Sequence, residues 1–254
     1  MLSLGFVLQK KGIAWMGWKK EKTRLYYTNL SIWVTGFLVM NVYGVPSAIA
    51  LKSLPPHIVA AFAGWGIVML VFFSRIFLKE KIFKSDYFYA VAIIVGIFIL
   101  GYFEPEKPAG KQVLDVLNLV LLVAVPVLLF LFALPKRLSK RLKRVFYASV
   151  SGMTAGLMVV SLRLLVMRLG YDVGLYFSSV FLYLYIFSAL LSLVSLQLAL
   201  KCGTMIAVGP VQYAANIIYP VFATLLVFHQ PLHIIQVPAV ALIVYAVVFL
   251  LKKH

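Results

Sequence analysis

Four polar side chains that could bind a small solute lie in one apolar stretch near the C-terminal end of the chain. They are Gln212, Tyr213, Asn216 and Tyr219. Gln212, Asn216 and Tyr219 are spaced four and three residues apart, so on a helix they share one face. Two amides and a phenol supply both hydrogen-bond donors and acceptors. We expect these residues to contact a solute from one side.

A second polar cluster lies in the first fifth of the chain, where Asn41 and Tyr43 stand beside a glycine and a proline. Pro46 cannot donate a backbone hydrogen bond, so it frees the carbonyl of Val42. Freed backbone at membrane depth is tolerated where it faces protein or a wet cavity. We expect Asn41 and Tyr43 to contact the solute from the other side. The residues expected to act as hinges are Gly44, Pro46, Pro210 and Pro220.

One basic residue, Arg163, lies well inside an apolar run. Two interpretations stay open. Its long side chain could extend to the headgroups at the near end of its helix. Alternatively it could face a cavity as an anion-binding or gating charge, which would disfavour a bare cation as the solute.

No motif for covalent chemistry is present. The chain has no nucleophile elbow, no glycine-rich phosphate loop and no Cys/His group with metal-ligand spacing. We therefore expect no catalytic residue, no metal site and no cofactor.

Composition limits the elements that can hold these residues. Of 254 residues, 63% are hydrophobic and 12% are charged, yet the net charge is +17. A soluble nucleic-acid-binding protein could share that charge but not that hydrophobicity, and the single cysteine, Cys202, excludes a disulfide scaffold. The chain is predicted to be an all-α integral membrane protein.

Apolar runs of about 20 residues, the length that crosses a bilayer, alternate with charged or Gly/Pro-containing segments. They predict about nine transmembrane helices. The expected spans are 1–9 (a short one), 28–51, 55–78, 85–103, 113–134, 146–168, 176–200, 203–228 and 232–251. With these spans, 19 of the 24 basic residues fall on one side of the membrane and four on the other. The positive-inside rule then predicts an outer N-terminus and a cytoplasmic C-terminus, in a plasma or inner membrane.

The chain also shows a weak internal repeat. A shift of 149 residues aligns 50–81 with 199–230 and superposes the expected helix ends without a gap. Five spans separate the two copies, and this odd number predicts an inverted repeat. The whole chain, 1–254, is expected to form a single transmembrane domain. Its pseudo-repeat halves are 1–134 and 145–254, joined by the basic cytoplasmic loop 135–144.

Several segments resemble the drug/metabolite transporter superfamily, whose members have the EamA-like fold. The first half has its pattern: Ala50-Leu51, then an apolar run closing on Lys79-Glu80-Lys81, and a following span with Gly96 and Gly101. Within the superfamily the chain is similar to NIPA-like magnesium transporters. The matching segments are Gly5-Phe6-Val7-Leu8-Gln9-Lys10-Lys11-Gly12, 33–40, Ser195-Leu196-Gln197 and Gly209-Pro210-Val211-Gln212-Tyr213. The resemblance implies transport and adds Gln197 to the expected solute contacts.

The chain departs from the NIPA-like pattern at one position. Gly44 stands where those proteins have an acidic residue, and all seven acidic residues here lie in loops or at helix ends. Mg²⁺ prefers hard oxygen ligands, one or two of them carboxylates. A membrane interior without a carboxylate offers only hydroxyls, amides and carbonyls.

These features together predict a transporter that moves a small solute by alternating access. A Mg²⁺ or other divalent-cation permease is the first alternative, and a membrane scaffold subunit that transports nothing is the second. The expected partners are the solute or ion and membrane lipid, with no nucleic acid. A homodimer is left open.

Overall fold

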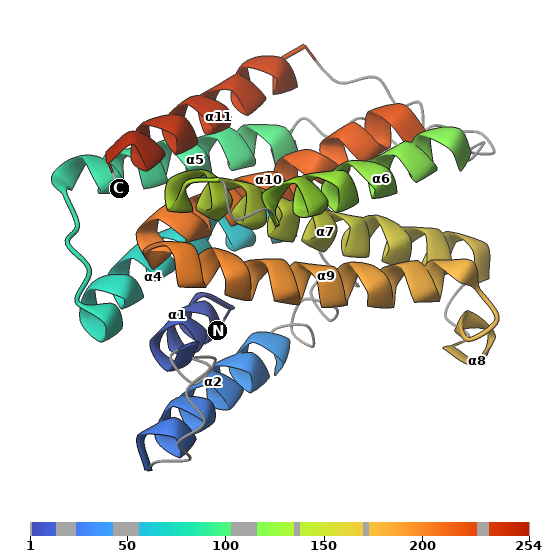
Figure 1. The fold of residues 1–254 in the computed structure, drawn as a ribbon. Helices are drawn as coiled ribbons and strands as arrows, with labels where there is room; N and C mark the ends of the chain where they lie inside the picture. The colour runs from blue at the N-terminus through green and yellow to red at the C-terminus, as the bar shows by residue number, and fades with distance from the viewer. Residues whose placement is uncertain are drawn as a thin grey trace. The chain divides into compact units, whose positions relative to one another are not determined.

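The computed structural model describes residues 2–13, 24–42, 56–102, 116–134, 138–169, 173–227 and 234–253. Over these residues the chain forms helices and no strands (Figure 1), which confirms the all-α prediction for this part of the molecule. In chain order the helices are α1 (Leu2–Gly12), α2 (Arg24–Val42), α4 (Pro56–Leu78), α5 (Lys84–Tyr102), α6 (Val116–Ala133), α7 (Lys140–Leu169), α8 (Val173–Tyr176), α9 (Val180–Cys202), α10 (Met205–Val227) and α11 (Gln236–Lys253).

Four of the described helical segments are long and apolar enough to cross a membrane. They are Val116–Ala133, Lys140–Leu162, Val180–Cys202 and Met205–Ala223. Two shorter apolar stretches, Gly66–Leu78 and Gln236–Leu250, lie in α4 and α11. The fold has the helices of a membrane protein, and the number of nine spans stays a prediction.

The apolar runs predict most helix bounds to within a few residues, and α7 differs most. It begins at Lys140, six residues before the expected 146, and has 30 residues. At 1.5 Å per residue it is about 45 Å long, well beyond the roughly 30 Å hydrocarbon core. Lysine and arginine are good helix formers, so the basic segment continues the helix instead of forming a loop.

The repeat predicted at a shift of 149 residues pairs α4 with α10, which contain Pro56–Leu78 and Met205–Val227 in the described part of the chain. The repeat and the inverted relation between the halves stay predictions.

The contacts divide the chain into two compact units. The first contains residues 1–104, 203–210 and 233–254, and the second contains 105–202 and 211–232. Helix α10 therefore passes from one unit to the other after Pro210. The two units do not follow the boundary between 1–134 and 145–254, and those halves stay a prediction about the repeat.

In the first unit α1 packs closely against α2 (Figure 1) through three glycines. A Cβ built on Gly5 would lie 2.7 Å from the carbonyl oxygen of Gly36, and one on Gly36 would lie 2.7 Å from the backbone nitrogen of Gln9. A Cβ on Gly12 would lie 2.5 Å from the carbonyl oxygen of Asn29. Only glycine allows backbones to approach this closely.

The same unit pairs α5 with α11 (Figure 1). Gly96 of α5 packs against Ala239 and Ile243, and the rings of Tyr89 and Phe249 stack with centroids 5.9 Å apart. These contacts hold the C-terminal helix along the length of α5.

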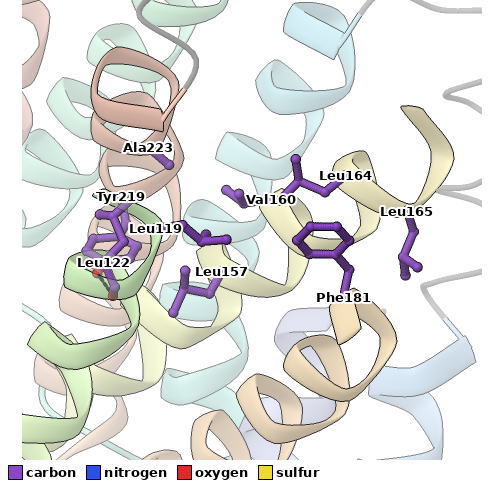
Figure 2. Close-up of a cluster of buried hydrophobic side chains, with 9 residues drawn as sticks. All are labelled: Leu119, Leu122, Leu157, Val160, Leu164, Leu165, Phe181, Tyr219 and Ala223. Carbon is purple, nitrogen blue, oxygen red and sulfur yellow. Dashed lines mark hydrogen bonds between the residues drawn. The ribbon is translucent and has the colours of Figure 1, made fainter. Parts of the chain in front are cut away.

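The second unit is built on a buried apolar cluster shared by α6, α7, α9 and α10. Figure 2 shows Phe181 beside Leu164 and Leu165 at one end, and Tyr219 beside Leu119 and Leu122 at the other. The remaining members are Leu157, Val160 and Ala223. This cluster includes Tyr219, the last residue of the predicted polar face of α10.

Candidate functional site

The polar face of α10 is almost entirely buried. Gln212, Tyr213 and Tyr219 are 5%, 1% and 7% exposed, and Asn216 is half-buried. The helix runs unbroken through Pro210 and Pro220, so these side chains keep helical spacing.

Gln212 differs from its neighbours in one respect. Its Oε1 atom is buried and has no hydrogen-bond partner among the described residues. A buried acceptor without a partner costs about 1–3 kcal/mol, and such groups in native proteins are rare enough to need an explanation. Gln212 therefore has an unused acceptor in the interior of a helix that is apolar and long enough to span a membrane.

Tyr219 is engaged by the protein itself. Its hydroxyl donates to the backbone carbonyl of Leu122 in α6, one of the contacts within the cluster of Figure 2. Pro126, four residues further along α6, has no N–H and so cannot bond to that carbonyl. Tyr219 thus supplies the donor that α6 lacks at this point.

The backbone of α10 lies directly against α7 over the same stretch. A Cβ on Gly152 would meet the carbonyl oxygen of Gln212, and would lie 2.9 Å from the backbone nitrogen of Asn216. One turn later, a Cβ on Gly156 would lie 2.8 Å from the ring of Pro220. Gly152 and Gly156 form a Gly-x-x-x-Gly pair, the small-residue pattern that lets membrane helices approach closely.

Helix α9 presents further polar groups in the second unit. The Ser192 hydroxyl donates to the backbone carbonyl of Ser151 in α7 at 2.9 Å. The buried hydroxyls of Ser188 and Ser195 have no hydrogen-bond partner among the described residues. Gln197, expected to contact the solute, is 5% exposed in the same helix.

The other predicted site residues are only partly described. Asn41 lies in α2 and Arg163 lies in α7, and the structure describes the backbone alone at both positions. Tyr43, Gly44 and Pro46 lie outside the described residues. The structure therefore brings Gln212, Tyr213, Asn216, Tyr219 and Gln197 into one unit, and contact from both halves stays a prediction.

The sequence did not reveal a set of polar contacts at the start of α10. The Glu80 carboxylate accepts hydrogen bonds from the backbone N–H groups of Met205 and Ile206 at 2.7 and 3.0 Å. The Lys10 ammonium donates to the carbonyl of Gly203 at 2.7 Å. Both pairs join segments more than 100 residues apart, and no local pattern predicts such a pairing. The nearest signal was that Lys10 and Glu80 both fall in segments that carry the family resemblance.

Other chemistry can be stated for the described residues only. In them no three His, Cys, Asp or Glu side chains are grouped so as to hold a metal ion. Comparison with known proteins gives no significant match to a family model, a curated protein or a solved structure.

Proposed function

We propose that this protein is a polytopic membrane transporter of the drug/metabolite transporter type, which moves a small solute by alternating access. The observation that carries the proposal is the buried, unpartnered Oε1 of Gln212 in a helix apolar and long enough to cross a membrane. Polar groups in such helices are functional-site candidates because each one costs free energy in hydrocarbon. A solute that donates a hydrogen bond to Oε1 would offset that cost.

The surrounding residues support an uncharged or weakly charged solute. Gln212 and Asn216 are amides one turn apart, and each offers both a donor and an acceptor. Tyr213 lies between them in sequence and is fully buried. Because Tyr219 is bonded to α6, we place the solute contacts at Gln212, Tyr213 and Asn216, toward the start of the polar face.

The topology that we propose has nine spans in two inverted halves, with the N-terminus outside and the C-terminus in the cytoplasm of a plasma or inner membrane. The alignment of 50–81 with 199–230 at a shift of 149 residues supports the repeat. The excess of basic residues on one set of loops supports the orientation.

Flux into proteoliposomes tests the proposal. The purified chain is reconstituted and presented with radiolabelled amino acids, nucleosides, sugars and organic amines. Mg²⁺ entry is followed in parallel with an entrapped indicator dye. We expect saturable uptake of at least one organic solute above empty liposomes, and a raised KM or complete loss of uptake for Gln212→Leu.

The matched control is Gln236→Leu. Gln236 is also a buried glutamine, 3% exposed, but its Nε2 donates to the carbonyl of Leu100 at 3.3 Å. We expect this variant to keep the KM of the native chain. Mg²⁺ entry without any organic solute would decide for the divalent-cation permease, and no flux of either kind would favour a scaffold subunit.

A further inference from the structure

The N-terminus of α10 is capped by a side chain from the segment between α4 and α5. The first turn of an α-helix has backbone N–H groups with no partner inside the helix. In α10 two of them, at Met205 and Ile206, donate to the two carboxylate oxygens of Glu80, which follows α4. A carboxylate at this position also interacts favourably with the helix dipole.

The residue that would ordinarily provide this cap does not do so. Thr204 directly precedes α10, and its carbonyl accepts the first helical bond, from Val208 at 3.0 Å. A threonine in this position usually caps its own helix through its hydroxyl. Here the Thr204 Oγ1 atom is buried and has no hydrogen-bond partner among the described residues. The cap from Glu80 replaces the local one.

Two further features hold the chain around the cap of α10. Lys79 has a φ of 54°, a left-handed conformation that is unusual for a residue other than glycine, and it sets the direction of the chain at Glu80. From the other side, Lys10 at the end of α1 donates to Gly203. Gly203 and Met205 are therefore each bound by a charged side chain from the first 104 residues.

We propose that Lys10 and Glu80 are positioning residues for the polar face of α10. Together they anchor the α9–α10 turn and the first turn of α10 to α1 and α4. Because α10 is continuous across Pro210, anchoring its first turn limits the rotation of the helix seven to eleven residues later, where Gln212 and Asn216 lie. Gln212 and Asn216 lie one turn apart on this helix, so a rotation of its anchored end would turn both amides by the same angle.

The packing beyond the anchor favours transmission along the helix. A Cβ on Gly209 would lie 2.7 Å from the end of the Leu70 side chain of α4, so the helix is held against α4 to the end of its anchored segment. Only the identification of the amides as solute contacts rests on the proposed function. The anchoring itself can be measured without a solute.

Thiol labelling of the full chain in proteoliposomes tests the proposal. Two single-cysteine reporters are made in a Cys202→Ser background. Thr204→Cys places a thiol sulfur close to the position of the buried Thr204 oxygen, and Asn216→Cys reports on the polar face. We expect Lys10→Met and Glu80→Gln each to raise the rate of N-ethylmaleimide labelling at Thr204→Cys at least fivefold, and at Asn216→Cys at least threefold. Lys10→Arg can still donate to the Gly203 carbonyl and is expected to keep the native rates.

Two controls separate anchoring from general loosening. Lys11→Met removes the neighbouring lysine, which is exposed and lies over the ring of Phe77 at 5.9 Å. Asp86→Asn weakens another helix cap, in which Asp86 accepts from the backbone N–H of Phe83 at 2.8 Å. Both controls should leave the two labelling rates within twofold of the native values.

Faster labelling at both reporters, absent in the controls, supports the proposal. Unchanged labelling at Thr204→Cys overturns it, and so does faster labelling at Thr204→Cys with no change at Asn216→Cys. An equal increase in the controls overturns it as well. Because no transported solute enters this experiment, its result is independent of the flux assay.

Discussion

The hydrogen bond from Tyr219 to Leu122 can be tested through the proline that makes it necessary. Pro126 removes the helical partner of the Leu122 carbonyl, and the Tyr219 hydroxyl replaces it. Tyr219→Phe keeps the ring in a site that is 7% exposed and removes only the donor. A buried carbonyl left without a partner costs about 1–3 kcal/mol.

For a chain of this length each kcal/mol corresponds to roughly 2–4 °C in Tm. Tyr219→Phe should therefore lower Tm by roughly 2–12 °C, read from intrinsic fluorescence of the purified chain in detergent. In a Pro126→Ala background, residue 126 regains its N–H and can bond to Leu122. The same substitution should then cost less than about 0.5 kcal/mol, so the double-mutant cycle should give a coupling energy of about 0.5–3 kcal/mol.

Tyr147 provides the matched control for this cycle. It is 5% exposed, and its hydroxyl donates to the carbonyl of Ala133 at 3.0 Å, at the last residue of α6. Tyr147→Phe removes the same kind of bond, but its cost should not depend on Pro126. The reasoning is refuted if Tyr219→Phe costs the same in both backgrounds.

Three other predictions concern packing, lipid contact and backbone conformation. Gly152→Ala should lower Tm, because its Cβ meets backbone and Cβ atoms of α10 and overpacking costs about 1–3 kcal/mol. Gly209→Ala meets only the flexible ends of the Leu70 and Met205 side chains and should change Tm by less than half as much, and equal shifts would contradict this. Leu128→Asp, at a site 62% exposed within α6, should reduce the carbonate-resistant membrane fraction, since a charge in mid-span costs about 2.5–3.5 kcal/mol. Leu142→Asp, at a site 48% exposed at the basic end of α7, should leave that fraction unchanged, and equal fractions for the two variants would argue against lipid at α6. Lys79→Gly should raise Tm slightly, because glycine adopts the left-handed conformation without the roughly 1–2 kcal/mol that lysine requires. A lower Tm would show that the lysine side chain contributes more to stability than its backbone conformation costs.

The positions of the helices could be predicted because the length of an apolar run is constrained by the bilayer and its ends are marked by charges, glycines or prolines. The run 55–78 predicts α4, which occupies Pro56–Leu78. Helix α8 was not predicted, because four residues are too few to show a periodicity. The start of α7 was placed six residues late, because a run of basic residues indicates where hydrocarbon ends but not where a helix ends. The cap of α10 by Glu80 spans 125 residues of sequence, and local residue patterns do not predict pairings between segments so far apart.

The polar face of α10 shows what residue spacing alone can and cannot establish. Spacings of four and three residues predict that Gln212, Asn216 and Tyr219 share a face, but they do not say what that face meets. The rule that a proline frees the carbonyl four residues before it applies to Pro126 as it does to Pro46, and it predicts an orphan acceptor at Leu122. It does not identify the donor, which comes from another helix 97 residues away. Since Tyr219 satisfies that carbonyl, polarity within an apolar helix is here explained by the protein itself, without a solute. Gln212, whose Oε1 has no partner among the described residues, has no such explanation, and for that reason the transport proposal depends on Gln212 more than on any other residue of the face.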